Sequence, residues 1–348
     1  MMMKNSLSNF TGKEALYFLI LTLVFFIIAE KAAIFRFEPA GYREIFHSTA
    51  ALILSLFFFL YAFIQSVILI RHSRGIIRLG GLFFQFAIIL LCTSLWVSNY
   101  SRFEGKFVRM QGQTFNGFKK DYLPQTVYLG KKAKFAHMGV TIKKITPYPA
   151  STVNKLDKVT ADIIYQSRTS KGLVYKTFSS KMPFFTDWSF VSISDFGYAP
   201  RYVLLDNEEK EVESNYLYKK LYPPGKEDSF EFYFLGYVLY LQCFPDFVDV
   251  DGKAASKSAE LKKPVFNLRI ARNKDIVYNG LIRTDEKIRF DNIRMAFPEV
   301  RYWIEVSIVR DFGLPVLAVA FLFLLVGVVL LWIDGRRKRS CEISGEID

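Results

Sequence analysis

The chain has 348 residues, is 51% hydrophobic and 17% aromatic, and carries a formal net charge of +13 at pH 7. Such a charge suits nucleic acid, but no nucleic-acid-binding motif is present, and basic residues also gather beside membranes. The three cysteines, Cys92, Cys243 and Cys341, form no C-x-x-C, zinc-type or C-x-x-C-H spacing and are expected to stay unpaired. The composition excludes a c-type cytochrome and a dithiol oxidoreductase, and it favours an integral membrane protein.

Four apolar stretches are long enough to cross a bilayer as helices, which takes about 20 residues. They cover residues 15–35, 49–70, 80–98 and 312–333. The first could be a signal peptide, but its apolar part is long for one and no A-x-A cleavage site follows. We therefore expect an uncleaved anchor and four transmembrane helices, three before a large polar region and one after it.

Basic residues set the expected orientation, because Lys and Arg collect on the cytoplasmic side. The loop between the second and third stretches holds three arginines within 71–78, and the tail after the fourth reads Arg336-Arg337-Lys338-Arg339. With four spans, both segments and the N-terminus fall on one side. We expect a multi-pass protein of the bacterial inner (plasma) membrane, with residues 99–311 extracytoplasmic and residues 334–348 as a basic cytoplasmic tail.

Residues 99–311 alternate between apolar and polar positions, which is typical of half-buried strands. The clearest runs are 266–270 and 304–308, and a polar segment at 272–275 indicates a hairpin. Further strands are expected at 126–129, 140–145, 159–165, 190–193, 202–205 and 230–243. The acidic run 207–213 and the small, charged run 251–263 are expected to be loops. The pattern predicts an all-β sandwich or barrel-like domain.

Catalytic signatures are missing from the sequence: there is no G-x-S-x-G, phosphate-binding loop, H-E-x-x-H or G-x-G-x-x-G. Asp246, Asp249 and Asp251 lie close together, but their spacing does not match a calcium loop. We expect an accessory protein and not an enzyme.

The histidines are the obvious candidates for a haem or metal ligand, and there are three: His47, His72 and His137. The expected topology places His47 and His72 on opposite sides of the membrane, so they cannot ligate one iron. Each could equally be a surface or hydrogen-bonded histidine. Glu30 and Lys31, near the outer end of the first span, are either interfacial anchors or functional intramembrane charges.

Several segments look like motifs of one known family. They are Asp195-Phe196-Gly197-Tyr198-Ala199-Pro200, Phe244-Pro245-Asp246-Phe247, Lys263-Pro264-Val265-Phe266 and Val309-Arg310-Asp311-Phe312-Gly313. With three spans, a large outer domain and a last span, the chain resembles the ResB family (Ccs1 or CcsB) of system II cytochrome c biogenesis. The resemblance covers most of the chain.

The resemblance implies an assembly factor that acts with a polytopic ResC/CcsA-like partner to deliver haem to apocytochromes c outside the membrane. It leaves haem b open as a cofactor, with His47 and His72 as candidate ligands. Where the family has a histidine before its third span, this chain has Arg78, and arginine is not an ordinary haem ligand. That departure keeps a second function open, a structural subunit of a membrane electron-transfer complex.

Overall fold

A computed structural model describes most of the chain from Thr49 onward. The described residues are 49–72, 75–130, 132–135, 138–147, 159–166, 172–232, 235–273, 275–284 and 286–345. For residues 49–52, 54, 72 and 337–345 the description covers the backbone alone. The chain divides into two compact units. The helical unit comprises Met1–Arg102, Leu129–Lys134 and Asp311–Asp348, and the β unit comprises Phe103–Tyr128 and Phe135–Arg310.

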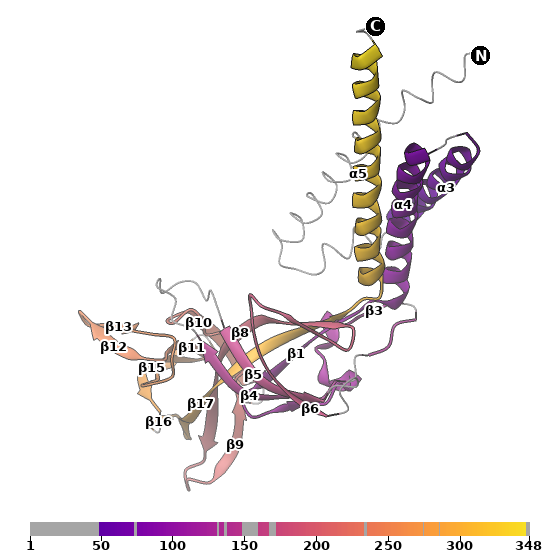
Figure 1. Ribbon diagram of the computed structural model, residues 1–348. Coiled ribbons are helices and arrows are strands. Elements are labelled where there is room, and N and C mark those ends of the chain that lie inside the picture. Colours follow the sequence, from indigo (N-terminus) through magenta and orange to yellow (C-terminus); the bar gives the residue numbers. More distant parts are fainter. Residues whose placement is uncertain are drawn as a thin grey trace. The chain divides into compact units, whose positions relative to one another are not determined.

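The helical unit contains three long helices among its described residues: α3 (Thr49–His72), α4 (Gly75–Ser101) and α5 (Gly313–Gly345) (Figure 1). Two segments are long and apolar enough to cross a membrane, Gly75–Ser101 and Gly313–Arg336, and Ser55–Arg71 is a shorter apolar helix. Three of the four expected spans thus coincide with helices, and two of these three contain a segment that is long and apolar enough to cross a membrane. The first expected span, 15–35, lies outside the described residues. Membrane sidedness and the domain boundaries stay predictions.

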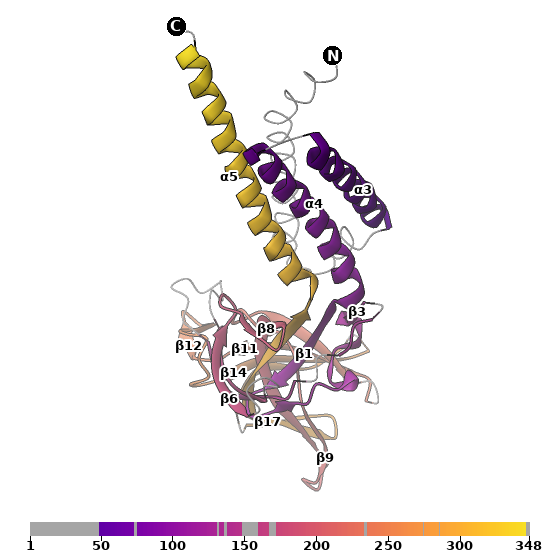
Figure 2. The same cartoon turned by 45° about the vertical axis from the view of Figure 1, so that its right-hand side comes forward.

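Helices α4 and α5 run side by side (Figure 2). They approach closely because glycines occupy contact positions on both helices. A Cβ atom on Gly327 would lie 2.8 Å from the backbone nitrogen of Phe84, and one on Gly80 would lie 3.1 Å from that of Leu331. Small residues let helix backbones approach and gain dispersion contacts where no hydrophobic force drives association. Phe83 and Phe323 add a ring contact at 5.3 Å between centroids. These contacts make α4 and α5 a tightly packed pair.

The β unit is built from sheets, and every pairing with a described register is antiparallel. The largest sheet has the order β3-β1-β17-β8-β7, with β16 on β17 and β9 on β8. Its strands are β1 (Phe103–Met110), β3 (Tyr128–Leu129), β7 (Phe184–Thr186), β8 (Ser189–Leu205), β9 (Glu211–Tyr216), β16 (Lys287–Phe290) and β17 (Ile293–Arg310).

Two four-stranded sheets and one hairpin complete the β unit. One sheet has the order β2-β4-β5-β6 and the other β10-β11-β14-β15, while β12 pairs with β13. The strands are β2 (Thr114–Phe115), β4 (Val140–Pro147), β5 (Val159–Gln166), β6 (Leu173–Ser179), β10 (Glu227–Phe232), β11 (Tyr237–Phe244), β12 (Phe247–Val250), β13 (Lys253–Ser256), β14 (Val265–Arg272) and β15 (Asp275–Arg283). Two short 3-10 turns, Lys119–Asp121 and Pro124–Thr126, are the helical content described within this unit.

Aromatic side chains join the sheets into a core. Phe107 on β1 stacks on Phe115 of β2 with ring centroids 3.7 Å apart, and Phe266 on β14 meets Phe297 on β17 at 5.0 Å. All four side chains are fully buried. Each such burial contributes about 1.5–3 kcal/mol relative to exposure, so these rings are a main source of the unit's stability.

The prediction of a β-rich region is confirmed, and its clearest strands are where alternation placed them, in β14 and β17 with a β14–β15 hairpin. Two runs predicted separately, 190–193 and 202–205, are one strand, β8. Gly197 and Pro200 between them disfavour a strand locally. Long antiparallel pairing with β17 overrides that preference.

Other strand predictions were wrong in detail. The run 230–243 is two strands, β10 and β11, because the chain turns at Gly236, whose φ is +68°. Thr126 ends a 3-10 turn and does not begin a strand. The two expected loops, 207–213 and 251–263, contain the start of β9 and all of β13. Their polar composition hid these strands because exposed edge strands need few apolar residues.

Candidate functional site

The residues proposed as haem ligands lie where their side chains are not described. His47 and His137 fall outside the described residues, as do Glu30 and Lys31, and His72 is the last residue of α3 with its backbone alone described. Arg78 is half-buried in the first turn of α4. Within the described ranges, no three His, Cys, Asp or Glu residues form a metal-binding group.

Two sulfur atoms of the β unit, those of Cys243 and Met138, lie in its packed core. Cys243 is completely buried and Met138 is 4% exposed. Burial raises the pKa of the Cys243 thiol well above its usual range, which opposes the thiolate form that binds metals. Neither sulfur atom is therefore placed to ligate a haem iron.

The Asp195–Pro200 segment lies in the middle of β8, where Gly197 makes room for an aromatic ring. A Cβ atom at Gly197 would lie 2.6 Å from Nε1 of Trp303, the residue opposite it on β17. The same Nε1 donates a hydrogen bond to the Lys219 carbonyl oxygen at 2.9 Å. The glycine in this segment is thus required by the indole of the neighbouring strand.

Large rings flank that glycine on both strands. Phe196 lies 5.7 Å from Tyr198 and also 5.7 Å from Tyr302 across the strand pair, and Tyr222 completes the group at 5.8 Å from Phe196. Burial raises the pKa of both the Tyr198 and Tyr302 phenols. These hydroxyls therefore stay protonated at physiological pH and act as hydrogen-bonding groups.

Both hydroxyls bind the β13–β14 loop, residues 257–264. The Tyr198 hydroxyl donates to the Ala259 carbonyl oxygen at 2.9 Å, and the Tyr302 hydroxyl accepts from the backbone N–H of Leu261 at 2.7 Å. A buried hydroxyl that lacked such a partner would cost about 1–3 kcal/mol. The tyrosines thus tie the loop to the middle of the β8–β17 pair.

The same loop is bound on its other side by the Phe244–Phe247 segment. The backbone N–H groups of Lys262 and Lys263 donate to the Pro245 carbonyl oxygen at 3.0 and 3.1 Å, and the Ser258 hydroxyl donates to Asp246 Oδ2 at 2.9 Å. Two of the four family-like segments, 195–200 and 244–247, therefore bind the β13–β14 loop, and a third, 263–266, begins within it, so all three meet at this loop. We take this convergence as the candidate functional site.

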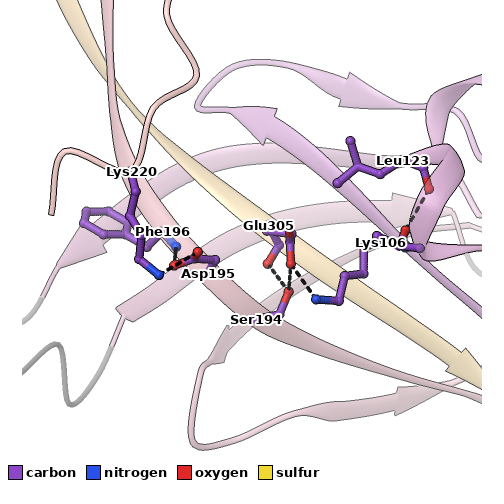
Figure 3. Close-up of polar contacts among 8 residues, drawn as sticks. Lys106, Leu123, Ser194, Asp195, Phe196, Lys220 and Glu305 are labelled. Atoms are coloured by element: carbon purple, nitrogen blue, oxygen red, sulfur yellow. Dashed lines mark hydrogen bonds and ion pairs between the residues drawn. The ribbon is translucent and has the colours of Figure 1, made fainter. Parts of the chain in front are cut away.

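A row of polar side chains continues from the site across the large sheet (Figure 3). Lys106 Nζ on β1 lies 2.9 Å from Glu305 Oε1 on β17, and the Ser194 hydroxyl on β8 donates to the same oxygen at 2.7 Å. Next to Ser194, Asp195 Oδ2 pairs with Lys220 Nζ at 2.9 Å. Lys106 and Glu305 are about one-fifth exposed, so this row is reachable by a partner.

The fourth family-like segment, 309–313, joins the end of β17 to α5. Asp311 Oδ1 accepts from the Gly313 N–H at 2.8 Å and caps the helix. Asp311 Oδ2 accepts from the Ser98 hydroxyl at 2.6 Å and lies 3.4 Å from an Arg102 guanidinium nitrogen. The carboxylate is almost fully buried. Asp311 therefore caps the start of α5 and also links that helix to the end of α4 through Ser98 and Arg102.

The site can bind but shows no catalytic arrangement among the described residues. Its tyrosine hydroxyls are held protonated by burial, its serine hydroxyls donate to carboxylates, and its lysines Lys106 and Lys220 are each paired with a carboxylate. The sequence pointed to the glycine-containing segment but missed Trp303, Tyr302 and Glu305. They were visible only as members of an alternating strand, because their partners are about 100 residues away in the chain.

Comparisons with known proteins identify no family. No protein-family profile matches the sequence, and no curated protein does. Among solved structures the chain is weakly similar to one titled "Cytochrome c Heme Lyase CcmF", with a TM-score of 0.30 and 10% sequence identity, over 89% of this chain and 34% of that one. The chain thus spans about a third of the length of that heme lyase.

Proposed function

We propose that the chain is a ResB-type membrane assembly factor that supports haem delivery and the maturation of c-type cytochromes with a ResC/CcsA-like partner. Its role is accessory, and the β unit binds the partner or the apocytochrome on the extracytoplasmic side of the inner membrane. The observation that carries this proposal is the convergence of three family-like segments on one loop of the β unit. Segments far apart in sequence that share one place in the fold favour a common binding role.

The helical unit supports the membrane part of this proposal. Helices α4 and α5 have the length and apolar composition of spans, and each ends or begins within three residues of a strand of the large sheet. A partner bound to the β unit would therefore belong to the same membrane or lie just outside it.

Deletion of the gene tests the proposal through the covalent haem of c-type cytochromes, measured by in-gel haem staining. We expect the staining to be lost and then restored by the wild-type gene. The double variant Asp195→Ala/Lys220→Ala, which removes an ion pair beside the site, should restore it poorly. The matched control Arg283→Ala/Glu286→Ala removes an exposed pair elsewhere and should restore it fully. Normal staining in the deletion strain would overturn the proposal.

A second candidate function, a structural subunit of a membrane electron-transfer complex, is favoured by Arg78 in place of the family histidine. It predicts that the protein purifies with a quinone- or cytochrome-bearing complex while c-type cytochromes mature normally without it. The deletion experiment therefore separates the two functions, because only the assembly factor is needed for covalent haem attachment.

A further inference from the structure

The hairpin formed by β7 and β8 exposes three large aromatic side chains at its tip. Phe185, Trp188 and Phe190 are 55%, 56% and 42% exposed. The rings contact one another, with the Phe185 centroid 5.0 Å from that of Phe190 and 6.2 Å from that of Trp188. Phe185 and Phe190 are directly paired across the hairpin, so all three rings form one aromatic tip.

The opposite face of the hairpin is fixed in the core. Phe184 is 6% exposed, and its ring lies 5.5 Å from Tyr165 and 5.2 Å from Phe178 on the neighbouring sheet. Side chains alternate between the faces of a strand, so burying Phe184 directs Phe185 outward. The aromatic tip is therefore held in place by the core and does not depend on its own contacts.

The turn at the tip holds a residue that the turn geometry disfavours. Asp187 and Trp188 connect the paired residues Thr186 and Ser189, and their φ angles are +45° and +60°. Two-residue hairpin turns with positive φ at both positions strongly prefer Asn-Gly or Asp-Gly, and a bulky residue there is strained. Folding alone would favour glycine at position 188, so the indole points to a role outside folding.

The aromatic tip lies at the end of the sheet from which the chain enters both long helices. Ser189, next to Trp188, pairs with Arg310, the last residue of β17, and Arg310 also pairs with Phe103, the first residue of β1. Three residues, spanning at most about 11 Å, take the chain from Arg310 to the start of α5 at Gly313. Phe103 follows the end of α4 by two residues.

We propose that the aromatic tip of Phe185, Trp188 and Phe190 inserts into the headgroup region of the bilayer that α4 and α5 cross. Tryptophan and other aromatic rings are enriched at this depth of a membrane. The insertion would be a further attachment of the β unit, beside its covalent links to α4 and α5. It rests on the membrane placement proposed above for the helices, and it does not depend on the role in cytochrome maturation.

A lipid surface is favoured over a protein partner because the tip belongs to the sheet end that carries the covalent links to the spans. The links from this end of the sheet to α4 and α5 are only two or three residues long, which leaves the tip within reach of the surface that the spans cross. Exposed apolar clusters of this kind mark binding surfaces. Three exposed rings that contact one another suit a fluid interface, whereas protein hot spots fill well-packed pockets.

Fluorescence quenching of the full-length protein in nanodiscs of phosphatidylcholine and phosphatidylglycerol tests the proposal. An environment-sensitive maleimide dye is attached to Trp188→Cys in a Cys341→Ser background, where Cys92 and Cys243 are buried. The quenchers are aqueous iodide and a phosphatidylcholine with a nitroxide near the headgroup end of its acyl chain. We expect strong quenching by the lipid nitroxide and several-fold weaker quenching by iodide than at the control position.

The control is Val212→Cys, a 66% exposed apolar position on β9, which pairs with the opposite end of β8. It should be quenched by iodide and not by the lipid. Leu325→Cys on α5 reports whether that helix is in the bilayer. Lipid quenching at 325 but not at 188 would overturn the insertion alone, whereas its absence at both would also remove the membrane placement. Protection of 188 from both quenchers would mean that protein covers the tip, and would overturn the proposal.

A second variant separates insertion from folding. Trp188→Gly supplies the residue that the turn prefers, so the variant should unfold at the same or a higher temperature. With the dye moved to Phe190→Cys, the glycine variant should show measurably weaker lipid quenching than the otherwise identical Trp188 protein. Equal quenching with and without Trp188 would contradict a role for the indole in insertion.

Discussion

The α4–α5 helix pair and the β8–β17 strand pair both depend on glycine, but for opposite reasons. Gly327 lets two backbones touch, because a Cβ atom there would meet the Phe84 backbone nitrogen. Gly197 instead makes room for a side chain, the Trp303 ring. A backbone in a helix cannot yield without moving the helix, whereas a ring can tilt. Substitution of Gly327 is therefore expected to destabilise the protein more than substitution of Gly197.

The two pairs also differ in where they keep charge. Asp311 and Arg102 in the helix pair have side chains only 3% and 10% exposed, while Glu305 and Lys106 in the sheet are 19% and 21% exposed. Loss of one partner of a buried ion pair strongly destabilises the fold, whereas exposed ion pairs contribute little to its stability. The helix pair should therefore be the more sensitive to loss of a charge.

The largest effect is expected from Asp311→Ala, which removes the cap of α5 and leaves Arg102 and Ser98 without this acceptor. The free energy of unfolding should fall by about 3–5 kcal/mol, as measured in mild detergent. Asp311→Asn keeps a capping oxygen and should lose less. Combining Asp311→Ala with Arg102→Met should recover part of the loss, because the buried guanidinium that faced Asp311 is gone. A loss from Asp311→Ala no larger than that of Lys106→Ala would remove the contrast between the pairs.

Gly327→Ala should separate α4 from α5 and cost about 2–3 kcal/mol, at the upper end of the range for overpacking. Gly335→Ala on the same helix is the matched control, because no atom lies within 4 Å of its added Cβ. Alanine favours helix over glycine by about 1 kcal/mol, so the control should be neutral or stabilising. Disulfide crosslinking between cysteines placed on α4 and α5 would report the separation directly, and equal crosslinking in both variants would argue against it.

Gly197→Ala should cost less, about 1–2 kcal/mol, because the Trp303 ring can shift. The expected signs are a lower melting temperature and a changed tryptophan emission. Gly139→Ala, where the added Cβ meets open space, serves as the control. Combining Gly197→Ala with Trp303→Val should show positive coupling, since the smaller residue removes the clash. Simple additivity of the two substitutions would mean that the contact is unimportant.

The smallest effect concerns Glu299, a surface carboxylate on β17. Hydrogen bonds from Arg301 and Tyr216 hold the pKa of its carboxyl below the ordinary value of 4.5. A lowered folded-state pKa stabilises the fold above the ordinary pKa, and that contribution is lost as pH falls through the lowered value. Glu299→Gln should slightly flatten the acid side of the melting temperature profile. A profile identical to that of the wild-type protein would contradict the assignment.

Local pattern was enough to predict the β-rich region and its clearest strands, because side-chain alternation depends only on neighbouring residues. It failed at β8, where Gly197 and Pro200 interrupt the pattern and pairing with β17 supplies the missing stabilisation. It also missed eight strands, among them β9 and β13, which lie in charged segments. The family-like segments were recognised singly, but their convergence on the β13–β14 loop depends on pairings between distant parts of the chain.

By itself, the sequence located the long apolar segments and the clearest alternating strands, since hydropathy and periodicity are local properties. Only the tertiary structure determined the contacts that Gly197, Asp311 and Trp188 make. It placed Gly197 against Trp303, buried Asp311 beside Arg102 and directed Trp188 outward at a turn that disfavours it. These outcomes depend on long-range register and close packing, and a one-residue shift in register would change every one of those partners.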